Sequence, residues 1–107
     1  MEVYNILGKG HSEVTYKNAL EFELTENKIL FSREKQFKIN YKGILLPNYY
    51  NADFVVEDKI ILEVKDISCL TDSHIKQTLN YLAISKYKLD LLVNFGEDSL
   101  VNKRIVL

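Results

Sequence analysis

The sequence predicts an α/β protein in which a mixed β-sheet is flanked by two helices. Three observations lead to this class: two segments with apolar residues at helical spacing, six shorter segments rich in β-branched and aromatic residues, and the order in which they occur. One helical segment comes first, four extended segments follow, and a second helical segment precedes two more extended ones. With 107 residues the chain is long enough for one domain, over residues 1–107, around a single modest core.

The first helical segment runs from Glu13 to about Asn27. Tyr16 and Leu20 fall at helical spacing, and Ser12 can act as the N-cap because its hydroxyl can accept a backbone N–H of the first turn. The glycines just before the segment do not indicate a dinucleotide-binding loop, because no strand precedes them and a third glycine is missing. They indicate a turn before the helix.

Two extended segments follow the first helix. Residues 28–33 (KILFSR) and 35–43 (KQFKINYKG) are predicted to form a hairpin or adjacent strands, since the second alternates apolar and polar residues. The single proline, Pro47, lies beside NYYN and is predicted to be in a loop.

The remaining elements carry stronger signals. Residues 52–56 (ADFVV) and 59–67 (KIILEVKDI) flank a polar turn and are predicted to be two antiparallel central strands. Residues 73–87, with Thr71 or Asp72 as cap, are predicted to be the second helix. Two further strands are expected after it, a buried one in KLDLLVNFG and a short last one in KRIVL.

The composition limits the class of function. A net charge of −1 argues against a protein that coats nucleic acid or membranes nonspecifically, but it allows a local basic patch around an active site. Cys69 is the only cysteine, which excludes an internal disulfide and a multi-cysteine zinc site. No apolar run approaches the ~18 residues that a membrane span needs. We therefore expect a cytoplasmic or otherwise intracellular protein that does not enter a membrane.

Three charged residues accompany the predicted central strands. Asp53 lies in the first strand, and Glu63 and Lys65 project from one face of the second, because side chains alternate along a strand. Antiparallel pairing brings Asp53 opposite the end of the second strand, so the two carboxylates can bind a hard divalent cation and the ammonium can engage a phosphate or a water. The alternative is a surface ion pair beside a loop aspartate, and spacing alone favours that alternative.

Longer sequence motifs elsewhere in the chain favour the metal site over the surface ion pair. The run VYNILGKGHSEVTY, followed in order by ADFVV, IILEVK, QTLNYL and LLVNFG, resembles the GxxExxY family of the PD-(D/E)XK nuclease superfamily over nearly the whole chain. Gly10, Glu13 and Tyr16 match the signature that gives the family its name. The resemblance implies a restriction-endonuclease-like core.

The resemblance also implies roles for individual residues. It makes Asp53 and Glu63 metal ligands, adds Glu13 from the first helix as a third carboxylate, and makes Lys65 the catalytic lysine. The implied cofactor is Mg²⁺, with Mn²⁺ as an alternative. Without the resemblance, Glu13 is an acidic residue that the helix dipole favours at an N-terminus, an effect of ~0.3–1 kcal/mol.

Gln77 and Tyr81 match a Q-x-x-x-Y feature found in several branches of that superfamily. At positions i and i+4 they can face the site together, where Gln77 can bind a phosphate or orient Lys65. A polar fringe beside the apolar stripe of the helix is an equally good interpretation.

The leading hypothesis is a Mg²⁺-dependent nuclease that hydrolyses phosphodiester bonds, with DNA the expected substrate. The alternative is a catalytically silent module that kept the nuclease fold and binds nucleic acid or a protein partner. A third hypothesis is a nuclease that needs a second copy, as a homodimer, or another partner to act, because the sequence carries no recognition element of its own.

Overall fold

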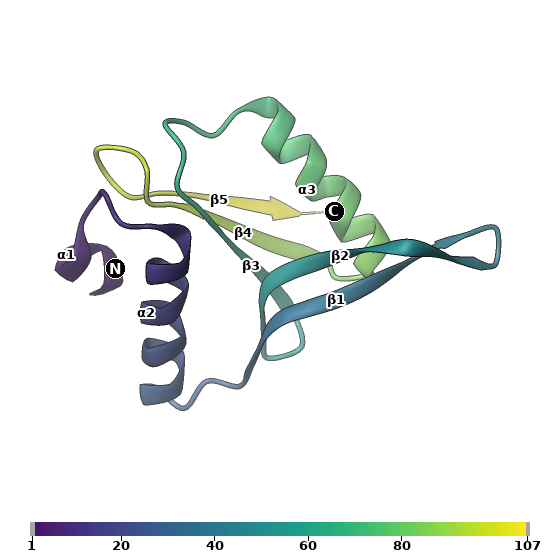
Figure 1. Ribbon diagram of the computed structural model, residues 1–107, viewed down its shortest axis with the longest axis horizontal. Coiled ribbons are helices and arrows are strands. Elements are labelled where there is room, and N and C mark those ends of the chain that lie inside the picture. Colours follow the sequence, from purple (N-terminus) through teal and green to yellow (C-terminus); the bar gives the residue numbers. More distant parts are fainter. Residues whose placement is uncertain (1, 107) are drawn as a thin grey trace.

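The computed structural model of the protein describes residues 2–106 and places a five-stranded mixed sheet between helices (Figure 1). The helices are α1 (Glu2–Leu7), α2 (Glu13–Glu26) and α3 (Asp72–Ser85), and the strands are β1 (Phe31–Tyr41), β2 (Ile44–Val56), β3 (Ile60–Lys65), β4 (Leu89–Asn94) and β5 (Val101–Val106). The strands lie in sequence order; β3 and β4 are parallel and the other neighbours are antiparallel. The predicted fold class is therefore confirmed.

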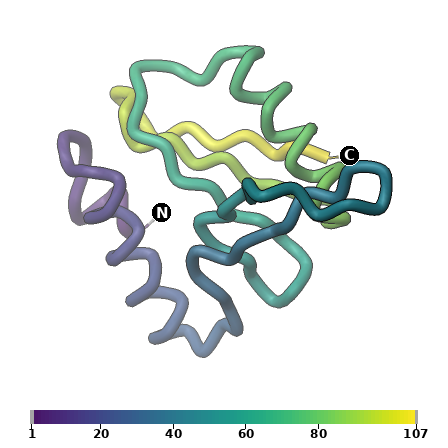
Figure 2. The backbone as a smooth tube through the Cα atoms, turned by 45° about the vertical axis from the view of Figure 1, so that its right-hand side comes forward, coloured from purple at the N-terminus to yellow at the C-terminus, as the bar shows by residue number. Residues whose placement is uncertain are grey.

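The two longer helices cover opposite faces of the sheet (Figure 2). On the α2 face, Tyr16 and Leu20 pack against Phe54, Val64 and Phe95. On the α3 face a second cluster joins the helix to the central strands; its buried members are Tyr50, Ala52, Val55, Ile61, Leu82, Leu92 and Ile105. Helix α3 is the crossover that lets β3 and β4 run parallel.

The predicted boundaries of both main helices agree with the structure. Helix α2 begins after Ser12, whose Oγ accepts the backbone N–H of Thr15 at 3.3 Å. Helix α3 begins after Thr71 and ends before Lys86, which adopts a left-handed conformation. The short helix α1 was not predicted. Across residues 2–106, no helix has the length and apolar character needed to cross a membrane.

The prediction that residues 28–33 and 35–43 form a hairpin or two adjacent strands is wrong. Residues 31–41 form one strand, and the chain reverses instead at Lys42 and Gly43, whose φ values of 52° and 82° are those of a two-residue type I′ turn. Pro47, expected in a loop, lies within β2. The pairing shifts register between Lys38 and Asn40, and such an irregularity accommodates a residue that has no N–H to donate.

Candidate active site

Strand β2 bends at Asp53, and this bend sets the direction of the Asp53 side chain. Ala52 packs on the α3 face whereas Phe54 packs on the α2 face, although residues two apart on a regular strand share a face. On β1, Glu34 lies between the paired residues Arg33 and Lys35 and has a φ of 55°. The irregularity therefore lies where β1 and β2 pass Asp53, and it lets the carboxylate turn out of the regular alternation.

The Asp53 carboxylate contacts both the neighbouring strand and helix α2. Its Oδ2 accepts the backbone N–H of Val64 at 2.8 Å, and its Oδ1 lies 2.9 Å from Nζ of Lys17. The same Nζ lies 3.2 Å from Oε1 of Glu34. Because Val64 stands between Glu63 and Lys65, the hydrogen bond places Asp53 beside the segment that carries both of these predicted site residues.

Glu63 is a buried carboxylate at the end of β3. It is 6% exposed, accepts a hydrogen bond from the hydroxyl of Tyr50 through Oε1, and lies 4.0 Å from Nζ of Lys65 through Oε2. Burial raises the pKa of Glu63, while the Tyr50 hydrogen bond and the Lys65 charge oppose this rise. The site therefore holds one deeply buried and one partly exposed carboxylate.

A stack of aromatic rings connects Glu63 to helix α3. The rings of Tyr50 and Tyr81 lie 3.8 Å apart between centroids at an interplanar angle of 14°. Gln77 Nε2 donates to the hydroxyl of Tyr81 at 2.9 Å. Burial and then the Glu63 charge raise the pKa of the Tyr50 hydroxyl, so it stays protonated and continues to donate. Tyr81 therefore packs on the ring that is hydrogen-bonded to Glu63, and Gln77 lies beside Tyr81 on the exposed side of the helix.

Asp90 is a site neighbour that the sequence reasoning missed. It lies on β4 beside Ile61 and is fully buried. Its carboxyl group lies within hydrogen-bonding reach of the Glu63 carboxylate, and in its ionised form it has no donor to accept from within residues 2–106. Burial, followed by the charge of Glu63, raises the pKa of Asp90 to about 9. A signal was available, because a single aspartate in the apolar run LDLLV is a charge in a segment predicted to be buried.

Glu13 stands apart from the other predicted ligands. It is the first residue of α2 and is partly exposed, one helical turn before the Lys17 that contacts Asp53. Within residues 2–106, no three His, Cys, Asp or Glu side chains lie close enough together to hold one metal ion. The structure thus places Asp53 beside the strand segment that carries Glu63 and Lys65, and it places Glu13 on the side of α2 that also carries Lys17.

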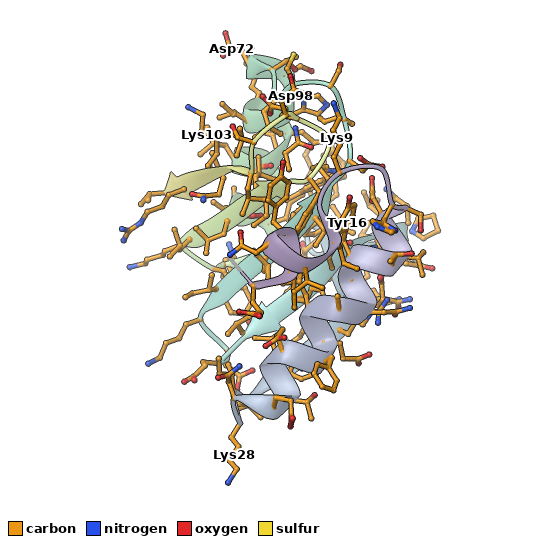
Figure 3. All side chains as sticks on the ribbon, turned by 90° about the vertical axis from the view of Figure 1, so that its left-hand side faces the viewer. Lys9, Tyr16, Lys28, Asp72, Asp98 and Lys103 are labelled. Atoms are coloured by element: carbon orange, nitrogen blue, oxygen red, sulfur yellow. The ribbon has the colours of Figure 1, made fainter. Side chains whose placement is uncertain are left out.

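The other two signature residues have structural roles. Gly10 has a φ of 103°, which a side chain would disfavour, in the turn that leads into α2. Tyr16 points from α2 into the core (Figure 3), where its ring stacks on Phe95 with centroids 4.1 Å apart. Its hydroxyl donates to the carbonyl of Gly8 at 2.6 Å and so ties the turn to the helix.

Asn94 and Gly96, from the LLVNFG block, contact the backbone of Ile67, in the segment that follows Lys65. Asn94 accepts the backbone N–H of Ile67 at 3.1 Å and donates to its carbonyl at 3.0 Å. A Cβ at Gly96 would collide with the Ile67 backbone. Lys65 accepts the backbone N–H of Phe95 at 2.9 Å, so both ends of this segment are fixed.

The donor atoms fit a hard divalent cation. Mg²⁺ is commonly held by one or two carboxylates together with waters and substrate phosphates, so a cage of three protein ligands is not required. Asp53 and Glu63 supply two carboxylates beside one β-strand segment, with the Lys65 ammonium adjacent. Such a set can bind a cation and act on an anionic substrate.

Comparison with known proteins agrees with this geometry. The family model described as the PD-(D/E)XK nuclease superfamily matches residues 1–105, and the chain belongs to that family. Its membership supports a nuclease-like function, and nucleases of this superfamily generally use divalent metals. None of the curated proteins compared with the chain matches it in sequence.

Two solved structures resemble the chain, and the likeness to the first shows a shared fold. The crystal structure of SSO0001 has a TM-score of 0.64 and 21% sequence identity, and the match covers 84% of this chain and 48% of that protein. An alkaline exonuclease (LHK-Exo) from Laribacter hongkongensis has a TM-score of 0.47 and 14% identity, with coverage of 83% and 53%. The chain therefore spans about half the length of each.

Proposed function

We propose that the chain is a metal-dependent nuclease of the GxxExxY branch that hydrolyses phosphodiester bonds in DNA. The observation that carries this proposal is the hydrogen bond from Val64 N–H to Asp53, which joins Asp53 to the strand segment bearing Glu63 and Lys65. Superfamily membership supports the reaction class. The lone, exposed Cys69 accords with the reducing interior of a cell as its location.

Asp53 and Glu63 would hold the cation, Mg²⁺ or Mn²⁺. Glu13, which does not form a cluster of three ligands with them, would contribute from α2 through a bridging water. When bound, such an ion supplies Lewis-acid polarisation of the phosphate and a water of lowered pKa. The Tyr50 hydroxyl keeps Glu63 in place through its hydrogen bond. The Val64 N–H does the same for Asp53, so both carboxylates are oriented by groups on neighbouring strands.

Lys65 would act on the substrate rather than on the cation. Its side chain is 28% exposed and its Nζ stands 4.0 Å from Glu63, so the ammonium can reach a phosphate at the edge of the site. Its charge stabilises the negative charge that grows on the phosphate oxygens in the transition state. Gln77, which is exposed and bonded to Tyr81, can donate to a neighbouring phosphate.

A second candidate function is a nuclease-fold module that binds nucleic acid or a protein without cutting. Two observations favour it: Lys17 already neutralises Asp53, and no group of three carboxylates gathers within residues 2–106. In this alternative the Lys17–Asp53–Glu34 contacts are purely structural.

A cleavage assay distinguishes the two candidates. Single-stranded, duplex and branched substrates are incubated with Mg²⁺ or Mn²⁺ and either wild type or Lys65→Ala. We expect wild type to cleave and the variant to lose about 10²–10³-fold in rate with an unchanged melting temperature, since Lys65 is a partly exposed strand residue. No cleavage by wild type with either metal would favour the binding module. Equal cleavage by both proteins would keep the nuclease but remove Lys65 from its mechanism.

The same samples test whether a homodimer is needed. If cleavage requires two copies, the specific activity will rise with protein concentration in step with the dimer fraction seen by sedimentation. A constant specific activity would show that one copy is sufficient.

A further inference from the structure

The outer half of the β1–β2 hairpin has an unusual charge. This segment, residues 35–51 and here termed the arm, extends away from the rest of the sheet (Figure 1). It contains Lys35, Lys38 and Lys42 and no acidic residue. Because the whole chain carries −1 and the arm carries +3, the rest of the chain carries −4. The arm is therefore a local concentration of positive charge on a slightly acidic protein.

The lysines of the arm lie over aromatic rings. Lys38 and Tyr49 are directly opposite each other on β1 and β2, with Nζ 5.5 Å from the ring centroid. At the tip, Nζ of Lys42 lies 5.4 Å from the Tyr41 ring. Both rings are well exposed, at 46% and 56%. Cation–π contacts of this kind hold the ammonium groups near the surface of the arm without neutralising their charge.

The arm is continuous with the candidate active site. Tyr50, which donates to Glu63, is the residue after Tyr49, and Asp53 follows three residues later on the same strand. Four residues of β-strand span at most ~13 Å, and one DNA strand carries a phosphate every ~3.4 Å of helix axis, so Lys38 and Tyr49 lie within about four phosphates of Asp53. A substrate strand cut at the site can therefore pass along the arm.

We propose that the arm is a nucleic-acid-binding element that contacts the phosphodiester backbone of the substrate on one side of the bond to be cut, through Lys38 and Lys42. This inference rests on the proposed nuclease function. Exposed aromatic rings beside the lysines suit it, because bases and ribose-phosphate chains pack on such surfaces.

A second copy of this chain fits the arm less well. Strand β1 is an edge of the sheet, and lysines on an edge strand oppose pairing with an identical strand because like charges would meet. Nucleic acid, in contrast, supplies the negative charge that the arm lacks. The charge complementarity therefore selects a polyanion as the occupant.

The test compares two double variants that change net charge equally. Lys38→Gln with Lys42→Gln removes the two ammonium groups of the arm, and Lys28→Gln with Lys59→Gln is the matched control. Lys59 is exposed in the turn before β3, and Lys28 projects from the end of the molecule opposite Asp72 (Figure 3). Binding of a fluorescent duplex and of a single strand is measured in EDTA over a range of salt concentrations, and cleavage is measured in parallel with Mg²⁺ or Mn²⁺.

We expect the arm variant to lose about tenfold or more in affinity at low salt and to reduce the slope of log K against log salt by about 1.8, or 0.9 per phosphate contact. KM should rise with kcat nearly unchanged, and the control variant should match wild type in all four quantities. An arm variant that binds with wild-type affinity and slope overturns the inference, even if wild type cleaves well. If the arm variant instead changes the oligomeric state in sedimentation, a second copy is the occupant and the inference is also wrong. Wild type that neither binds nor cleaves nucleic acid refutes the proposed function, and the inference with it.

Discussion

The two faces of the same five-stranded sheet bury very different side chains. The α2 face holds an apolar and aromatic cluster in which the one buried hydroxyl, that of Tyr16, has a partner in the carbonyl of Gly8. The α3 face holds two buried carboxylates, Glu63 and Asp90, next to Tyr50. In its ionised form Asp90 has no hydrogen-bond donor within residues 2–106, because its polar neighbour Glu63 is another carboxylate. Among these residues, only the α3 face leaves buried side-chain oxygens without a donor.

This difference indicates that the α2 face mainly stabilises the fold, whereas the α3 face carries the candidate site. A buried, unpartnered carboxylate destabilises a fold, so a chain that keeps one needs stabilisation elsewhere. Here the stacked Tyr16 and Phe95 rings and the fully buried Phe54 provide it on the opposite face. Departures from local consistency concentrate at functional sites in natural proteins, and the α3 face is where the candidate site lies.

The largest effect is expected on the α2 face. Phe95→Ala removes the ring that stacks on Tyr16 and leaves a cavity, so it should lower the free energy of unfolding by about 3–5 kcal/mol. Because the buried cluster around Phe95 contains no carboxylate or histidine, the loss should be the same from pH 5 to pH 9 in urea melts. A loss that changes with pH would show that the two faces are not independent.

The next effect belongs to Asp90 and should depend on pH. Its pKa in the folded protein is raised to about 9 from 3.8, so the folded state holds a proton that the unfolded state releases above pH ~4. The stability associated with this proton is complete below the unfolded pKa and is lost as pH rises towards 9. Asp90→Asn keeps the shape and removes the titration, so it should be more stable than wild type at pH 8 by at least ~2 kcal/mol and little different near pH 4.

Urea melts of wild type and Asp90→Asn at several pH values measure this difference. Leu92, two residues along on the same face, supplies a control as Leu92→Val, which changes packing without changing charge. Parallel pH profiles for wild type and Asp90→Asn would mean that Asp90 ionises normally in the folded protein.

Several elements of the fold and of the candidate site could be predicted from the sequence, for reasons that differ from residue to residue. Ser12 predicted the start of α2, because an N-cap hydrogen bond joins residues only three positions apart in the sequence. Strand alternation and hairpin pairing, which are short-range rules, predicted that Asp53, Glu63 and Lys65 lie near one another, but their selection as site residues came from the resemblance to the nuclease family. The contact of Lys17 with Asp53 could not be predicted, because a lysine on a helix is expected to face solvent unless the packing of α2 against the sheet is known.

Other residues were hidden by errors in element assignment. Tyr50 was missed because the proline and asparagines around it indicated a loop, whereas the structure continues β2 through this stretch and aims Tyr50 at Glu63. The bend at Asp53 lies opposite the left-handed backbone of Glu34 on another strand. Such a conformation in a charged residue has no reliable sequence signal.

A third prediction concerns the boundary between the faces. Asp53→Asn keeps the size of the side chain but removes one anionic ligand, so divalent-metal affinity should fall tenfold or more while the fold persists. Isothermal calorimetry with Mn²⁺ measures it, and Asp58→Asn in the exposed β2–β3 turn is the matched control. Equal affinity in wild type and Asp53→Asn would show that Asp53 does not bind the metal.

The smallest effect is expected from Lys17, the side chain that links the two faces by reaching from α2 to Asp53. Burial alone would lower the pKa of Lys17, but the hydrogen bond and the charge of Asp53 raise it above its usual value, so the ammonium stays charged throughout the working range. A cation 2.9 Å from Asp53 competes electrostatically with a metal for the same carboxylate. Lys17→Met keeps the aliphatic stem and removes the charge; it should tighten Mn²⁺ binding by about two- to fivefold, in line with the ~0.5–1 kcal/mol that a partly exposed ion pair contributes. The same calorimetric titration, with Lys28→Met as the control for net charge, shows whether the loss of the Lys17 charge tightens or weakens Mn²⁺ binding. Weaker metal binding in Lys17→Met would mean that Lys17 positions Asp53 for the metal instead of competing with it. Helix α2 would then contribute to the metal site together with the carboxylate on the α3 face.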